Sequence, residues 1–229
     1  FSYPSGVEAL RGVSLQVGAG ERIAMLGRNG AGKSTLLRHL NGLLLPTHGQ
    51  VLVAGTDTRR TTVARCARHA GIVFQDIRNQ LFARSVRDEL SFGPRNLGYR
   101  PAHVEQMVGR TLELLGLAEV ADQHPYDLPP ALRRLVAVAA VAAMGSDVLI
   151  LDEPTAGLDP TQIRETRELI RELGQQHTIL LSTHILSEVE MTCQRAIIIN
   201  QGMVATSGMV ADLKRDGGLE EVFVRITKE

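Results

Sequence analysis

A glycine-rich segment with a lysine and two hydroxyl side chains occupies residues 27–35, with the sequence GRNGAGKST. Glycines let successive backbone N–H groups curl around phosphate oxygens, and the start of a following helix adds positive potential. Lys33 can reach the outer phosphates, and the Ser34 hydroxyl can ligate Mg²⁺. Because the segment follows a predicted strand and opens a predicted helix, it predicts a phosphate-binding loop rather than a structural turn.

Two acidic residues follow a second apolar run, Val148–Leu151. Asp152 can hold Mg²⁺ through its water shell, and Glu153 can orient or deprotonate an attacking water. In isolation, the two acids would be expected simply to cap the turn before Pro154. The phosphate-binding loop elsewhere in the chain favours the catalytic interpretation.

Two further polar residues, Gln75 and His184, close the apolar runs Ile72–Phe74 and Ile179–Thr183. Ligands of parallel α/β sheets lie beyond the carboxyl ends of the strands, so both side chains could converge on the same γ-phosphate. Alone, either residue would be an ordinary loop residue. Together with the loop and the acids, they predict one site.

A sheet must position these residues, and the apolar runs supply its strands. Val13, Leu15 and Val17 alternate with polar residues, and residues 21–26 lead into the glycine-rich loop, so both segments are predicted as strands. Other runs lack alternation, as expected for strands buried on both faces of a mainly parallel sheet. These runs are 72–74, 148–151, 178–181 and 196–199.

Helical patterns lie between the predicted strands. Apolar residues recur at helical spacing over residues 104–115, and Gly116 follows at a favourable C-terminal position. A second helix is predicted to begin at Asp159 and Pro160, which suit the N-cap and first helical position, and to end near Gly174.

The composition is that of an ordinary globular protein. The 229 residues include 25 Lys and Arg against 25 Asp and Glu, and 44% are hydrophobic, which argues against disorder. Zero net charge gives no overall positive field, so no nucleic-acid partner is expected. The apolar run Leu135–Met144 is too short for a membrane-spanning helix, which needs ~20 residues. Cys66 and Cys193 lack metal-ligand or disulfide spacing and are expected to be reduced cytosolic thiols.

Taken together, these motifs resemble the nucleotide-binding subunit of an ATP-binding cassette (ABC) transporter, and the resemblance covers essentially the whole chain. Residues 27–35 match the Walker A loop of that family, and Gln75 matches the Q-loop. Residues 149–153 match Walker B, residues 157–159 the D-loop, and His184 the switch histidine.

The resemblance implies that the chain binds and hydrolyses ATP with Mg²⁺. Glu153 would be the catalytic carboxylate, assisted by His184 and Gln75, and Asp159 would act in the D-loop. Mg²⁺ would be held by Ser34, Gln75 and Asp152. ATP would contact Gly27, Asn29, Gly30, Ala31, Gly32, Lys33, Ser34 and Thr35.

Tyr3 lies 27 − 3 = 24 residues before Gly27. Its position resembles that of the aromatic residue that stacks on adenine in this family. A tyrosine at a strand edge is an equally good interpretation.

The resemblance also implies an architecture and partners. The fold would be α/β, a RecA-like P-loop NTPase core with a mainly parallel sheet, an antiparallel β edge and an inserted helical subdomain. Within one domain of residues 1–229, the core would comprise 1–75 and 148–229, and the helical subdomain 76–147. A second ABC ATPase subunit, identical or different, would be one partner. An integral membrane transporter subunit would contact the region after Gln75, placing the chain on the cytoplasmic face of the membrane.

Two parts of the chain resemble different groups within the family. Residues 75–98 resemble the ATPases of energy-coupling-factor importers of cobalt, nickel or vitamins, and this resemblance extends over 1–158. Residues 182–190 and 219–223 look more like ATPases of ABC-2 type exporters. The mixture suggests a chimeric chain, in which residues 76–130 would decide the substrate class.

The signature motif of the family, Leu-Ser-Gly-Gly-Gln, would begin 24 residues before Asp152, at position 152 − 24 = 128. The sequence there is Leu128, Pro129, Pro130, Ala131 and Leu132. In the family this motif donates hydrogen bonds to the ATP held by the other subunit, but proline has no N–H to donate. Losing one donor aimed at transition-state charge costs about 10² to 10³ in rate. A helix opening near Ala131 could still present its dipole.

These observations predict an ATP-binding subunit that energises a membrane transporter, most like a cobalt/nickel or vitamin importer. The alternative is a regulatory or degenerate subunit with little hydrolysis of its own. A soluble ABC ATPase of DNA repair or translation is disfavoured by the neutral charge and the absence of a second cassette in the sequence. A small-molecule kinase would need an acceptor pocket and a lid, which no motif marks.

Overall fold

A central sheet organises the molecule. The computed structural model describes residues 1–215 and 217–227, and within them six strands form this sheet. They are β1 (Arg22–Leu26), β4 (Ala70–Val73), β5 (Val148–Asp152), β6 (Thr178–Thr183), β7 (Arg195–Asn200) and β8 (Met203–Met209). The order is β4-β5-β6-β1-β7-β8, with parallel neighbours except for the antiparallel pair β7 and β8. The predicted mainly parallel sheet with an antiparallel edge is confirmed.

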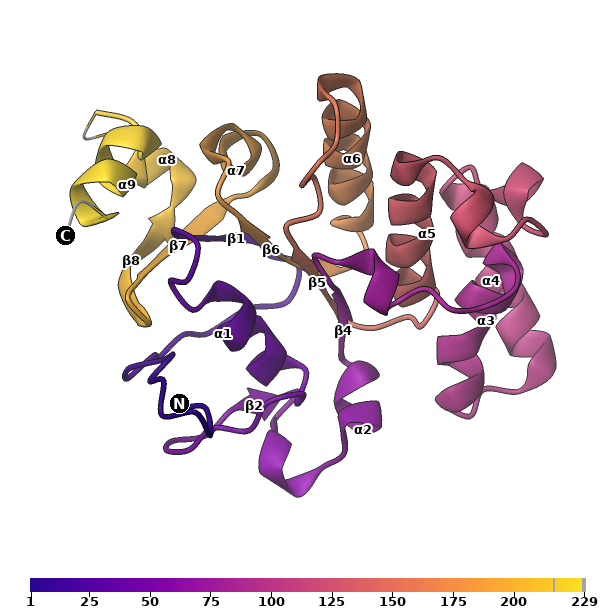
Figure 1. Ribbon diagram of the computed structural model, residues 1–229, viewed down its shortest axis with the longest axis horizontal. Coiled ribbons are helices and arrows are strands. Elements are labelled where there is room, and N and C mark those ends of the chain that lie inside the picture. Colours follow the sequence, from indigo (N-terminus) through magenta and orange to yellow (C-terminus); the bar gives the residue numbers. More distant parts are fainter. Residues whose placement is uncertain (216, 228–229) are drawn as a thin grey trace.

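Helices cover both faces of this sheet, as Figure 1 shows. They are α1 (Lys33–Leu40), α2 (Val63–Ala67), α3 (Val86–Asn96), α4 (Pro101–Leu114), α5 (Pro130–Ala142), α6 (Pro160–Leu173), α7 (Leu186–Thr192), α8 (Val210–Leu213) and α9 (Leu219–Thr227). Short 3₁₀ turns lie at Thr58–Arg60, Ile77–Asn79, Ala118–Val120 and Pro125–Asp127. A small antiparallel hairpin, β2 (Leu52–Val53) and β3 (Thr56–Asp57), lies with α1 and α2 on one side of the sheet.

Side chains of the central strands alternate between two apolar clusters, one on each face of the sheet. In β1, Ile23 and Met25 join the cluster that contains Leu37 of α1. Ala24 and Leu26 join the cluster on the other face, which also contains residues of α3 to α7. Because both faces are buried, these strands read as continuous apolar runs without polar alternation.

Residues 76–147 are described in full and contain helices and turns, but no strand. In Figure 1, α3, α4 and α5 lie together beside β4 and β5. Leu90 of α3, Val108 of α4 and Val136 of α5 share the cluster that covers one face of the sheet. The helical part is therefore packed onto the sheet through one continuous core. Among the described residues, no helix is long and apolar enough to cross a membrane.

The prediction of a strand at residues 13–17 is wrong. Val13, Leu15 and Val17 do pack against the cluster beneath α1, while Ser14 and Gln16 are exposed. The segment nevertheless stays outside every strand that the described residues form. Alternation reports that one side of an extended segment is buried, but a strand also needs a neighbouring strand with which its backbone groups pair.

The helix boundaries follow the predicted capping residues. Asp159 caps α6, since its side chain accepts hydrogen bonds from the N–H groups of Thr161 and Gln162 at 2.8 Å and 3.0 Å. Gly116 follows α4 with a φ of 64°, a conformation that favours glycine after a helix. Local sequence therefore determines where α6 begins and where α4 ends.

Candidate active site

The glycine-rich loop joins β1 to α1 at the carboxyl edge of the sheet. A Cβ atom at Gly27 would lie 2.6 Å from the carbonyl oxygen of Ile199. Gly32 has a φ of 105°, and its Cβ would lie 2.8 Å from the carbonyl oxygen of Ala9. Neither position can accept a side chain without a backbone shift. The two glycines thus let the loop lie tightly against backbone on both sides.

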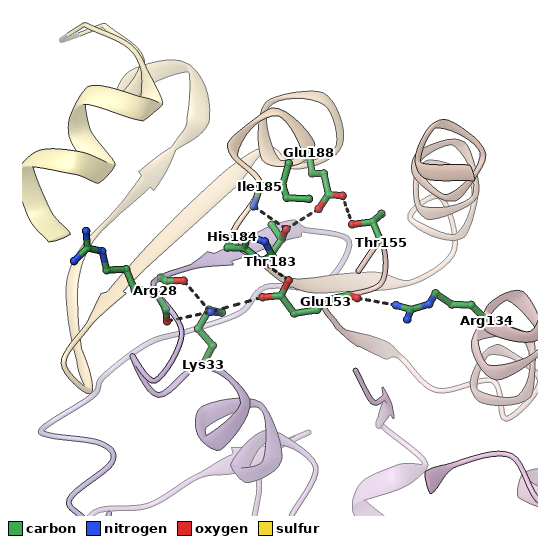
Figure 2. A network of polar contacts seen from close by, with 10 residues as sticks. Arg28, Lys33, Arg134, Glu153, Thr155, Thr183, His184, Ile185 and Glu188 are labelled. Carbon is green, nitrogen blue, oxygen red and sulfur yellow. Dashed lines mark hydrogen bonds and ion pairs between the residues drawn. The ribbon is translucent and has the colours of Figure 1, made fainter. Parts of the chain in front are cut away.

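Lys33 begins α1 and is almost fully buried. Its Nζ donates hydrogen bonds to the carbonyl oxygens of Gly27 at 2.8 Å and Arg28 at 3.3 Å, and lies 3.7 Å from Oε1 of Glu153 (Figure 2). A buried ammonium group requires such compensation by oxygen atoms. The lysine is therefore held at the loop, where it can exchange these partners for phosphate oxygens.

Glu153 is fixed by contacts from β6, from the residue that follows this strand, and from Lys33. Its φ of 51° is left-handed, which costs a non-glycine residue roughly 1–3 kcal/mol. Its N–H donates to the carbonyl oxygen of Ser182 at 3.0 Å, and its Oε2 lies 2.7 Å from Nδ1 of His184. Glu153 follows β5 and His184 follows β6, so the sheet brings the predicted base and histidine into direct contact.

Two groups that the sequence analysis did not identify complete this network. Arg134 of α5 donates from Nη1 to the carbonyl oxygen of Glu153 at 2.8 Å, and burial lowers the pKa of this guanidinium. Glu188 of α7 is buried and accepts hydrogen bonds from the hydroxyls of Thr155 and Thr183. Figure 2 shows both contacts. The contacts of Arg134 with Glu153 and of Thr155 with Glu188 join residues far apart in sequence. The contact of Thr183 with Glu188 lies within an irregular turn. No local sequence pattern predicts these contacts.

A cavity of about 690 Å³ lies over the loop. Its lining includes most of the predicted contact residues: Tyr3, Asn29, Gly30, Gly32, Lys33, Ser34, Thr35, Gln75 and Glu153. Of the remaining predicted residues, all described, Gly27, Ala31, Asp152 and His184 lie outside the lining. His184 is connected to the cavity indirectly, because it is hydrogen-bonded to Glu153, which lines it. The volume and the lining suit a nucleotide-sized ligand.

Tyr3 borders this cavity from the N-terminal segment. Its hydroxyl lies 2.9 Å from Oγ1 of Thr35, and its ring packs edge-on against Phe1 with 4.9 Å between ring centroids. An isolated bridge pairs the adjacent Ser2 with Glu8. The structure therefore places Tyr3 at the predicted site, and stacking on adenine stays a prediction.

The oxygen atoms predicted to hold Mg²⁺ are suited to that ion. Asp152 is buried, and within the described part of the chain its Oδ1 has no hydrogen-bond partner. Ser34 and Gln75 offer a hydroxyl and an amide oxygen at the cavity wall. Hard oxygen ligands with one carboxylate are what Mg²⁺ prefers beside phosphates. The residues present therefore fit the ion.

The altered signature segment lies outside this cavity. Pro129 is the N-cap of α5 and Pro130 its first residue, which confirms the predicted helix start, and both are exposed. Ala131 and Leu132 line a separate groove of about 260 Å³ between α5 and α6. The next residue, Arg133, bonds back to carbonyl oxygens of its own segment. The two prolines are thus exposed to solvent and lie outside the cavity over the chain's own loop.

Comparison with known protein sequences gives consistent matches. The sequence model of the ABC transporter family matches residues 10–156. A putative ABC transporter ATP-binding protein of Geobacter sulfurreducens is 46% identical over 211 residues, covering 92% of this chain and 84% of that protein. The energy-coupling factor transporter ATP-binding protein EcfA of Methanothermobacter thermautotrophicus is 37% identical over 222 residues, covering 96% and 71%. A single relative thus covers both parts of the chain that resemble different groups.

Solved structures show the same architecture. CbiO1 from Clostridium perfringens, part of the ABC transporter complex CbiONQ, superposes with a TM-score of 0.83 at 31% identity, covering 99% of this chain and 95% of that one. The ATP-binding cassette MJ0796, bound to ADP and Pi, gives 0.77 at 22% identity, with coverages of 88% and 90%, and supports the fold alone. The fold is the RecA-like P-loop architecture of ABC ATPase domains.

Proposed function

The chain belongs to the ABC transporter family as an ATP-binding ATPase subunit, and we propose that its site around Lys33 and Glu153 energises a membrane importer. The contact of Glu153 with both His184 and Lys33 carries this proposal. These contacts bring together a carboxylate base, a histidine and a lysine suited to phosphate at the carboxyl edge of the sheet. ATP hydrolysis needs such a combination of groups.

In the proposed reaction, the Glu153 carboxylate orients the attacking water and accepts its proton. His184 holds the second carboxylate oxygen and, being more than half exposed, can turn toward the γ-phosphate. Lys33 neutralises charge on the outer phosphates, with the N–H groups of the loop. Asp152, Ser34 and Gln75 would hold Mg²⁺, which would supply positive charge beside the triphosphate.

The working unit in this proposal is a dimer in which each ATP lies between two subunits. The exposed position of Pro129 and Pro130 supports this arrangement, because the start of the segment is available to another chain. In a homodimer both composite sites would contain the two prolines and hydrolyse slowly. A partner with an intact signature would complete one site at this chain's own loop, so a heterodimer is the more active assembly.

The membrane subunit would dock on the helical part, after Gln75. Phe82 and Phe92 are 61% and 48% exposed and pack edge-to-face with 4.6 Å between ring centroids. An exposed aromatic pair in a chain with so few aromatics suits an interface. The chain would therefore lie on the cytoplasmic face of the membrane. The likeness to EcfA and CbiO1 supports a transporter of the energy-coupling-factor type. The proposed cargo, cobalt, nickel or a vitamin, follows from the resemblance of residues 75–98.

The test is steady-state ATPase turnover of the purified chain with Mg²⁺, beside the variant Glu153→Gln and a separate ATP-binding titration. We expect tight ATP binding in both proteins, and a turnover that disappears in the variant because the carboxylate is lost. Enzymes commonly reach ~1 s⁻¹ or more, so turnover above roughly 0.1 s⁻¹ would support a working homomeric site. Failure to bind ATP would overturn the proposal.

A second candidate function is a nucleotide-binding subunit that hardly hydrolyses ATP. The two prolines at the start of α5 favour it, because they remove a hydroxyl and N–H donors from the surface offered to a partner. In the same experiment, tight ATP binding with negligible turnover would support this candidate. Addition of a partner subunit with an intact signature would then separate a degenerate subunit, which gains turnover, from a scaffold.

A further inference from the structure

Glu153 must hold a fixed backbone conformation if its carboxylate is to point at the cavity. Its N–H is bonded to Ser182 of β6, and its carbonyl oxygen accepts from the N–H of Ala156 at 3.1 Å and from Arg134 at 2.8 Å. The following residue is Pro154, which has no N–H, so the peptide between the two residues can be anchored only through its carbonyl. Bonds to both the N–H and the carbonyl fix φ and ψ, and therefore the direction of the side chain.

Arg134 is the part of this anchor that comes from the helical region. It lies in the second turn of α5, half-buried, and its guanidinium crosses from α5 to the turn after β5 (Figure 2). Its neighbour Arg133 turns the other way and bonds to the carbonyl oxygens of Tyr126 and Leu128, within the helical region. The two adjacent arginines thus donate hydrogen bonds to different segments, and Arg134 is the one that links α5 to Glu153.

We infer that Arg134 is a positioning residue that holds the Glu153 backbone in its left-handed conformation and couples the placement of α5 to the direction of the catalytic carboxylate. The inference rests on the proposed function of Glu153. Because α5 begins at Pro130, beside the segment offered to a second subunit, a shift of α5 on docking would be transmitted to Glu153 through this hydrogen bond. ATP binding itself depends on Lys33 and the loop, which Arg134 does not contact.

The test compares Arg134→Met, which keeps the length of the side chain, with Arg134→Lys, which keeps the charge and one donor. Arg110→Ala is the control, since Arg110 is an exposed arginine on α4. We expect kcat of Arg134→Met to fall about 10-fold to 100-fold, because small misplacements of a reacting group have effects of this size. The Kd for ATP should change less than about twofold, and Arg134→Lys should recover part of kcat.

Hydrogen exchange provides a readout that does not depend on turnover. Arg134 anchors the Glu153 carbonyl to which the Ala156 N–H donates, and without this anchor the turn after β5 should open more often. The Ala156 amide should therefore exchange faster in Arg134→Met than in wild type, and at the wild-type rate in Arg110→Ala. Unchanged exchange at residues 153–156, or an unchanged kcat in Arg134→Met, would overturn the inference. A wild-type chain without turnover would contradict homomeric hydrolysis instead, and the exchange rates alone would then decide the role of Arg134.

Discussion

Helices α1 and α5 both begin at short loops without a side-chain cap among the described residues, but their N-termini offer different backbone groups. At α1, Gly32 is the N-cap and the N–H groups of Lys33 and Ser34 follow, with the lysine side chain beside them. At α5, Pro129 is the N-cap and Pro130 follows, so that two N–H groups are missing. Both helices have a dipole, and a helix normally leaves its first N–H groups free to bind anions.

The difference separates what the chain does for itself from what it does for a partner. The α1 terminus lies at the cavity and carries the groups that we expect to bind phosphate. The α5 terminus is exposed, and its prolines remove donors that a second subunit would require. We therefore expect strong ATP binding at the chain's own loop and weak support for hydrolysis at a partner's loop. Substitutions at either helix terminus test this difference.

The largest expected effect is on the α1 side. Lys33→Ala should weaken ATP binding at least about 100-fold, because it removes charge-assisted bonds to the outer phosphates, each of which contributes about 1.5–3 kcal/mol. An ATP-binding titration with Mg²⁺ measures this change. Arg38→Ala is the matched control, since it removes the same charge from an exposed position of the same helix. Equal losses in both variants would contradict a specific role for Lys33.

The complementary experiment rebuilds the α5 side. The changes Pro129→Ser, Pro130→Gly, Ala131→Gly and Leu132→Gln together should raise ATPase turnover of the homodimer at least about tenfold, because one lost donor alone costs about 10² to 10³. Turnover at protein concentrations that give a dimer is the measurement. The same four changes combined with Glu153→Gln should remain inactive. Unchanged turnover would count against action of this segment on a partner's ATP.

A third prediction concerns the loop backbone. Gly32→Ala should destabilise the protein by about 1–2 kcal/mol, because alanine is strained at a φ of 105°, and its Cβ would also press on the Ala9 carbonyl. Urea unfolding measures the change in the free energy of unfolding. Gly109→Ala, inside α4 with no described heavy atom within 4 Å of the new Cβ, should instead stabilise by roughly 0.5–1 kcal/mol. A stable Gly32→Ala would show that the loop tolerates a side chain.

The smallest effect is expected at the other end of α1, where His39 is buried against Phe1 and its Nδ1 lies 2.8 Å from the carbonyl oxygen of Thr35. Burial lowers the pKa of His39 in the folded state, although the Thr35 carbonyl opposes this shift. The unfolded chain therefore binds a proton at His39 more readily than the folded chain does. The contribution of buried, neutral His39 to the free energy of unfolding is complete above pH ~6.5 and is lost as the pH falls through the pKa of the folded state.

The free energy of unfolding should consequently decrease below pH ~6.5, by at most about 1.4 kcal/mol per pH unit from this group. Unfolding curves of the wild type and His39→Gln across that range measure the difference. The variant should show the shallower decrease, because glutamine does not titrate. Identical slopes would mean that His39 accepts a proton in the folded state.

The sequence was sufficient to predict the strands that carry the site and the composition of the loop. Those strands are apolar runs that end in Gly27, Asp152 and His184, and such runs are found in local sequence alone. It failed at residues 13–17, where burial of one side produced the alternation of a strand without a pairing partner. It also missed β8, whose alternating burial depends on its edge position beside β7.

Sequence by itself determined which groups are present: a phosphate-binding loop, two strand-terminal acids, and prolines in place of a signature motif. Tertiary structure alone decided which of them touch. The hydrogen bonds from His184 and Arg134 to Glu153 span 31 and 19 residues, and the turns that form them come together only because β5 and β6 are neighbours and α5 packs beside them. Contacts between distant segments depend on strand order and packing, and these are properties of the whole core and not of any local pattern.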